Sequence, residues 1–120
     1  MPGVILVPPG VRIVLAARPV DFRKGMDGLA ALVQQALSAD PFAGEVFVFR
    51  AKRADRVKIL VYDGTGLVLY SKRLEAGRFS WPSPAEGVVR LTSAQLATLL
   101  EGLAWHRLRP RAIPRPSTAW

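Results

Sequence analysis

Three β-rich segments in the middle of the chain constrain its fold more than any other feature. They are the runs EVFVFR (45–50), RVKILVYD (56–63) and LVLYSKR (67–73), separated only by short connections. Their β-branched and aromatic content is typical of strands, and the glycine-bearing sequence DGTG between the last two suits a tight turn. Both faces of the first run are apolar, as expected for a central strand. The segments therefore predict an antiparallel meander.

Two shorter strands and two helices complete the predicted secondary structure. The run VRIVLAA (11–17), closed by a proline, indicates a first strand, and VVRL (88–91) a short strand after the proline-rich loop RFSWPSP. Asp21 is the expected N-cap of the first helix. A capping box formed by Thr92 and Gln95 begins the second helix. The apolar stripes of the two helices comprise Leu29, Leu32, Val33, Ala36 and Leu37, and Leu96, Leu99, Leu100 and Leu103.

Together these elements predict an α+β fold in a single domain. One antiparallel sheet of about four or five strands would carry the two amphipathic helices packed on it, because each leucine stripe needs an apolar surface to cover. The domain is expected to span residues 1–106. Residues 107–120 contain four arginines, three prolines and no acid, which predicts a basic, Pro-rich flexible tail.

The charge balance of the chain indicates a polyanionic partner. The 17 Lys and Arg residues outnumber the 9 Asp and Glu residues, which gives a formal charge of +8 and a pI near 11.1. So basic a domain is typical of nucleic-acid binders, although basic membrane-surface and ribosomal proteins share this property. The absence of cysteine and the single histidine exclude disulfides and Cys- or His-cluster metal sites. We expect no cofactor.

The N-terminal sequence, MPGVILVPPG, gives no sign of a targeting segment. It lacks a basic stretch, and its apolar run is too short for a signal peptide or a membrane span. We therefore expect a soluble, cytoplasmic and nucleoid-associated protein with no membrane partner.

A dense cluster of cations occupies the connection between the first two central strands. The sequence FRAKRADRVKIL holds one acid, Asp55, among Arg50, Lys52, Arg53, Arg56 and Lys58. If the two strands pair, the loop 51–55 projects cations from one end of the sheet, where they would contact nucleic-acid phosphates. The alternative is that these charges only keep a sheet edge soluble, a task for which either sign would serve. The excess of one sign favours phosphate binding.

Other cations extend the predicted phosphate-binding surface. Arg23 and Lys24 are expected in the first turn of the first helix, where the helix dipole disfavours positive charge but where phosphates bind readily. Pairing of these two cations with Asp21 and Asp27 on a solvated face explains them equally well. The remaining members of the predicted surface are Lys72, Arg73 and Arg78.

Two aromatic residues next to Arg78 are candidates for stacking on an unpaired base. These are Phe79 and Trp81, in the loop RFSWPSP. Aromatic residues among prolines more often cover a small core, so the structural interpretation is favoured.

The sequence gives no support for catalysis. Two-metal chemistry needs several carboxylates that converge on one site, and the acids of this chain are scattered over turns, caps and helix surfaces. The strongest candidates, Asp21, Asp27 and Asp63, each have a local structural task. A Ser-His-Asp triad would depend on His106, and no nucleophile-elbow motif accompanies a serine. We expect no catalytic residue.

Three blocks of the chain resemble a family of mobile-element proteins. They are DFRKGMDGLAALVQ, DPFAGEVFVFRAKRADRVKILVYDGTGLVLYSKRLEAGRFSWP and LTSAQLATLLEGLAW. In this order they are similar to the small accessory protein (the TnpB, or second-open-reading-frame, type) of the insertion-sequence 66 group. The resemblance extends to Trp105, whereas the tail departs from the pattern.

The resemblance implies a protein that is encoded beside a larger transposase and needed with it. It carries over no catalytic residue, since the activity of the family is undefined. Combined with the charge, it suggests a non-catalytic accessory protein of DNA transposition that binds DNA through its basic hairpin. The alternative is a protein-interaction module that docks on the transposase or on a sister accessory protein.

Overall fold

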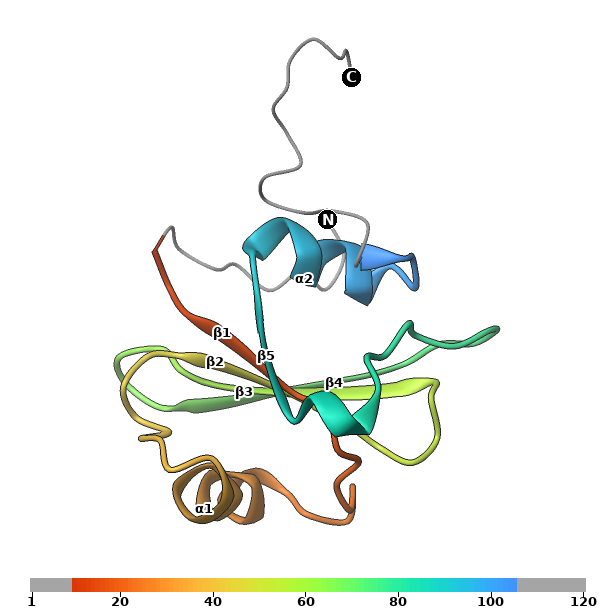
Figure 1. Ribbon diagram of the computed structural model, residues 1–120. Coiled ribbons are helices and arrows are strands. Elements are labelled where there is room, and N and C mark those ends of the chain that lie inside the picture. The colour runs from red at the N-terminus through yellow and green to blue at the C-terminus, as the bar shows by residue number, and fades with distance from the viewer. Residues whose placement is uncertain (1–9, 106–120) are drawn as a thin grey trace, which may run out of the picture.

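A five-stranded sheet with one helix on each face forms the computed structural model of the chain, which describes residues 10–105 (Figure 1). The order across the sheet is β4-β3-β2-β1-β5. None of the helices in this range is long and apolar enough to cross a membrane. The predicted tail, 107–120, His106 and the N-terminal residues 1–9 lie outside the described residues. The elements are β1 (Ile13–Ala16), α1 (Met26–Ala36), β2 (Val46–Arg50), β3 (Arg56–Tyr62), β4 (Leu67–Arg73), the short 3₁₀ helix η1 (Pro84–Glu86), β5 (Val88–Leu91) and α2 (Ser93–Leu100).

The sheet confirms the predicted α+β class and is mostly antiparallel. Strands β2, β3 and β4 form the expected meander, with Val48 opposite Ile59 and Ile59 opposite Tyr70. Strand β1 differs from the expectation, because it pairs parallel with β2 and places Leu15 opposite Val48. The residues between these two strands, including α1, provide the long crossover that a parallel pair requires. As a result, the C-terminal ends of β1 and β2 lie side by side at the same end of the sheet.

The predicted N-terminus of α1 is wrong. Gly25 is the N-cap and makes no side-chain capping bond. Asp21 instead accepts a hydrogen bond from the backbone N–H of Arg23 at 2.9 Å, which closes a turn ahead of the helix. Aspartate commonly stabilises such turns through its own backbone two residues on, in competition with helix formation. Arg23 and Lys24 therefore precede the helix, and the expected conflict with its dipole does not arise.

Helix α1 covers one face of the sheet. Its buried residues Leu29 and Val33 pack in a cluster with Val14, Phe47 and Leu60. Ala36, predicted in the same stripe, is exposed at the end of the helix. Burial of the apolar side chains removes hydrocarbon surface from water and fixes the helix on the sheet.

Helix α2 covers the opposite face, as Figure 1 shows. Its predicted capping box is confirmed: Gln95 N–H donates to the Thr92 hydroxyl, and Thr92 N–H donates to the Gln95 side chain. Leu96 and Leu99 are buried in the second core cluster. Leu103 is 58% exposed because the helix ends at Leu100, so this member of the predicted stripe does not contribute to the core.

Candidate nucleic-acid interface

The parallel pairing of β1 and β2 brings two cation-bearing segments together at the end of the sheet where both strands terminate. Residues 17–25 leave β1 there, and the loop 51–55 leaves β2 beside them. The backbone N–H of Val20 donates to the carbonyl oxygen of Arg50 at 2.8 Å and joins the two segments. The crevice outside the carboxyl ends of adjacent parallel strands is a recurrent ligand site in proteins.

A cavity of about 430 Å³, here called the basic pocket, opens between the two segments. Pro19, Val20, Phe22 and Ala51 provide apolar walls. The charged lining residues are Asp21, Arg23, Lys52, Arg53 and Arg56. The structure thus brings Arg23, which belongs to one predicted group of cations, into the same pocket as Lys52, Arg53 and Arg56 from the other group.

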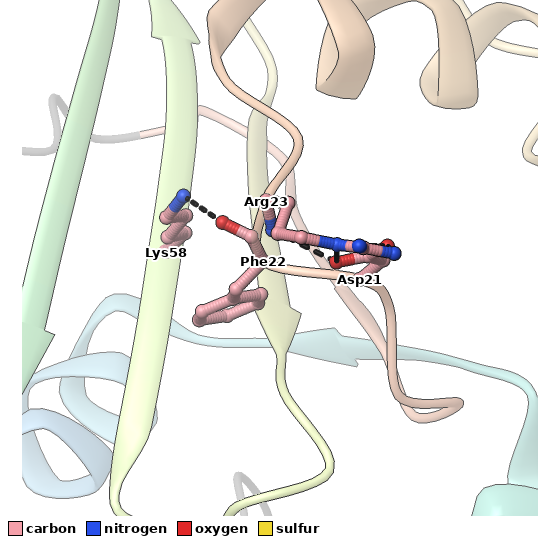
Figure 2. A network of polar contacts seen from close by, with 4 residues as sticks. All are labelled: Asp21, Phe22, Arg23 and Lys58. Atoms are coloured by element: carbon pink, nitrogen blue, oxygen red, sulfur yellow. Dashed lines mark hydrogen bonds and ion pairs between the residues drawn. The ribbon is translucent and has the colours of Figure 1, made fainter.

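Lys58 holds the segment after β1 against the sheet (Figure 2). Its ammonium group donates to the carbonyl oxygens of Phe22 at 2.9 Å and Lys24 at 3.0 Å. It also lies 5.1 Å from the centroid of the Phe22 ring, a cation–π distance. Lys58 was predicted as a phosphate contact, whereas the structure uses its charge to position the wall of the basic pocket.

Asp21 and Arg23 form a bidentate ion pair at the basic pocket. Figure 2 shows that this ion pair points away from Lys58. Arg23 Nη2 and Nε donate to Asp21 Oδ2 at 2.7 and 3.0 Å. The side-chain and backbone hydrogen bonds from Arg23 hold the pKa of Asp21 at about 2, and the same carboxylate raises the pKa of Arg23. The Arg23 side chain is 91% exposed, so its guanidinium can exchange this carboxylate for a phosphate of similar geometry.

The loop 51–55 contributes cations that are incompletely neutralised. Asp55 is its acid, and it lies 3.5 Å from Arg53 Nη2 and 3.8 Å from Arg56 Nε. The second distance is too long for a hydrogen bond, and both Arg56 Nε and Asp55 Oδ1 are buried without a hydrogen-bond partner among the described residues. Lys52 is exposed on the wall of the same pocket. Asp55 therefore lies near two of these three cations, at distances too long to neutralise either fully.

Two of the predicted phosphate contacts lie on the face of the sheet that α2 covers. Arg50 is opposite Val57, its guanidinium lies 5.4 Å from the Trp81 ring centroid, and burial lowers its pKa. The ammonium of Lys72 donates to the carbonyl oxygen of Leu100 at 2.7 Å, at the C-terminal end of α2. Both cations stabilise the fold, and neither lines the basic pocket.

The predicted base-stacking residues are also structural. Phe79 is 2% exposed in the core and packs edge to face on Trp81, so its ring cannot receive a base. Trp81 is half-buried, its Nε1 donates to the Ala54 carbonyl oxygen at 3.0 Å, and Arg50 lies over its ring. The aromatic residue that lines the basic pocket is Phe22, which was not among the residues predicted from the sequence.

The other predicted cations, Lys24, Arg73 and Arg78, do not line the basic pocket. Arg73 is opposite Arg56 at the same end of the sheet, and it pairs with Glu75 at 3.5 Å. Lys24 and Arg78 are exposed. Arg18 was missed, although it follows β1 after only one residue and precedes the pocket-lining Pro19, which places it at this end of the sheet. A cation soon after a strand was the available signal.

The opposite end of the sheet carries acidic residues. Asp40 and Glu45 precede β2, and Asp63 follows β3. Asp63 closes the predicted glycine-bearing turn by accepting hydrogen bonds from the N–H groups of Thr65 and Gly66, which lower its pKa. Arg12 pairs with Glu45 at this end, whereas the basic pocket at the other end has four cations and one acid in its lining, an excess that favours polyanions.

Comparison with known proteins places the chain in a family of mobile-element proteins. The sequence model described as IS66 Orf2 like protein (TnpB_IS66) matches residues 11–110. The chain belongs to this family of accessory proteins of IS66 insertion sequences, which supports a role in transposition. The matched range continues past Trp105, farther than the resemblance recognised in the sequence.

Two curated relatives come from Sinorhizobium fredii (strain NBRC 101917 / NGR234). "Uncharacterized protein y4jC" is 45% identical over 108 residues, which cover 90% of this chain and 92% of the relative. "Uncharacterized protein y4hO" is 39% identical over 107 residues, which cover 89% and 91%. No solved structure matches the chain significantly.

Proposed function

We propose that this protein is a non-catalytic accessory factor of transposition that binds DNA phosphates at the basic end of its sheet. The observation that carries the proposal is the convergence of Arg23, Lys52, Arg53 and Arg56 on one pocket. Lys and Arg contacts to phosphates supply most of the affinity of sequence-independent DNA binding. Bound to DNA in this way, the protein would be associated with the nucleoid.

The electrostatics of the pocket support a phosphate ligand. Arg56 lines the pocket with a side chain that is 39% exposed, and its ion pair with Asp55 is 3.8 Å long, too long for a hydrogen bond, so its guanidinium can pair with an anion in the pocket. The Arg23 side chain is 91% exposed and that of Asp21 47% exposed, so an incoming phosphate can reach the guanidinium and replace the carboxylate. Lys58 holds the pocket wall in place before any ligand binds, which limits the ordering cost of binding.

The test is the salt dependence of duplex binding in two charge-matched variants. Lys52→Gln with Arg53→Gln removes two cations at the basic pocket. Arg12→Gln with Arg90→Gln removes two near the start of β1, where both line another cavity. Each pair also breaks one surface ion pair, Arg53–Asp55 or Arg12–Glu45. Because each lost phosphate contact changes the log–log slope by about 0.9, the pocket variant should have a slope shallower by about 1.8.

The pocket variant should also bind about tenfold more weakly near physiological salt, while the control stays within about twofold of the wild type. Equal weakening in both variants would mean that only net charge matters and would refute the assigned surface. Association with the transposase, measured by pull-down, should be lost after nuclease treatment, because DNA forms the bridge. Survival of that association would instead favour the protein-docking function.

A further inference from the structure

The basic pocket is more than a cluster of surface charges. Its walls include Pro19, Val20, Phe22 and Ala51, and its volume of about 430 Å³ lies within the range of small-molecule sites. A duplex backbone offers phosphates and sugars to a protein surface while its bases remain stacked inside. Phosphate contacts alone leave the apolar walls without a partner.

The arrangement of charge and apolar surface matches the two halves of a nucleotide. Cations stand on the rim, with the Arg23 and Arg53 side chains 91% and 70% exposed. Val20 and Phe22 line the same pocket, are half-buried and pack on the α1 face of the sheet. A phosphate on the rim would place its own base against these walls.

Contacts with Lys58 fix the position of Phe22 before any nucleotide binds. Its carbonyl oxygen accepts from Lys58, and the same ammonium lies over its ring, so both backbone and side chain are fixed by one cation (Figure 2). An aromatic ring beside a cationic groove is the usual platform for unpaired bases, since every base offers a π-face.

We propose that the basic pocket seats one unpaired nucleotide of single-stranded DNA, with its phosphate on Arg23, Lys52 and Arg53 and its base against Phe22. This inference rests on the proposed function and specifies the form of DNA that the site prefers. Each of the four bases can contact these apolar walls in the same way. The pocket should therefore prefer an unpaired strand over a duplex without selecting a sequence.

The test compares DNA probes that have equal charge but differ in their bases. The wild-type protein is titrated with an oligothymidylate of about twelve residues, with its abasic counterpart of the same length and with a duplex, by fluorescence anisotropy. We expect the oligothymidylate to bind at least about tenfold more tightly than the abasic strand, because base stacking on an aromatic side chain contributes strongly to affinity.

Phe22→Leu should remove most of that tenfold difference between the oligothymidylate and the abasic strand, since leucine retains the apolar packing without the ring. The matched control is Phe42→Leu, because Phe42 is 52% exposed and precedes β2 at the opposite end of the sheet. Circular dichroism confirms that both variants are folded.

Each outcome decides between the two proposals. Equal affinity of the wild type for the thymidylate and the abasic strand overturns the nucleotide pocket and leaves phosphate binding intact. A thymidylate preference that Phe22→Leu leaves unchanged also overturns it. Failure to bind all three probes at low salt overturns the proposed function itself. Because the comparison of probes uses the wild-type protein, it remains decisive even if Phe22→Leu does not fold.

Discussion

Replacing Lys58 by Met tests whether this cation builds the basic pocket or binds its ligand. Methionine keeps the apolar stem of the side chain and removes two hydrogen bonds, to the carbonyl oxygens of Phe22 and Lys24. A hydrogen bond from a charged group contributes about 1.5–3 kcal/mol, and the bond to the exposed Lys24 carbonyl contributes less. The expected loss of unfolding free energy is therefore about 2–4 kcal/mol, or about 8–16 °C in Tm for a domain of this size.

Lys24→Met is the matched control for this prediction. It removes one positive charge from the adjacent, exposed side chain without touching the two bonds, so its stability should change by about 0.5 kcal/mol or less. Thermal unfolding and urea titration measure both variants. If Lys58→Met keeps wild-type stability and only makes the salt slope of DNA binding shallower by about 0.9, Lys58 is a direct phosphate contact and the structural reasoning is refuted.

Other substitutions separate the ligand-binding charges from those that stabilise the fold. Asp21→Asn should raise DNA affinity by about threefold in anisotropy titrations, since it frees Arg23 and keeps an acceptor for the Arg23 N–H; weaker binding would contradict this. The pKa of Asp21 is lowered from 3.8 to about 2, so its stabilising effect is present above about pH 4 and lost as the pH falls through 2. The stability difference between wild type and Asp21→Asn in urea should therefore vanish over that interval, and a constant difference would refute the assignment. Arg50→Gln should cost about 1 kcal/mol through its lost contact with Trp81 and leave duplex affinity unchanged, whereas a large affinity loss would place Arg50 in the interface.

The elements that the sequence predicted well have local signals. The meander follows from three segments rich in β-branched and aromatic residues with short connections between them. In the glycine-bearing turn between the last two, Asp63 accepts a hydrogen bond from the N–H of Gly66. Helix α2 begins where Thr92 and Gln95 satisfy its first backbone N–H groups. In each case the interacting residues are close in sequence, so the pattern contains the interaction.

The features that escaped prediction depend on partners distant in sequence. The parallel pairing of β1 with β2 joins segments that a whole crossover separates, and no local pattern specifies it. The amines of Lys58 and Lys72 were interpreted as free cations because their acceptors are backbone carbonyls far along the chain, at Phe22 and Leu100. Asp21 resembles a helix cap in sequence, yet the turn it makes with Arg23 competes with helix formation.

The same distinction applies to the candidate site. The loop 51–55 was found from the sequence because its cations are consecutive, and its position between β2 and β3 is as expected. The apolar walls of the pocket were not found, since Pro19 and Phe22 meet Ala51 only through the parallel sheet edge. Charge density along a sequence can indicate a binding surface, whereas its shape depends on topology.

Backbone amide chemical shifts during titration with single-stranded DNA test the central claim most directly. The claim is that the edge where β1 and β2 end is the DNA-binding surface. The amides of residues 18–25 and 51–56 should shift in proportion to occupancy, and those of α2 and of the β3–β4 turn at the opposite end should remain in place. Shifts centred on α2 or on that turn, with the two pocket segments unperturbed, would contradict the account.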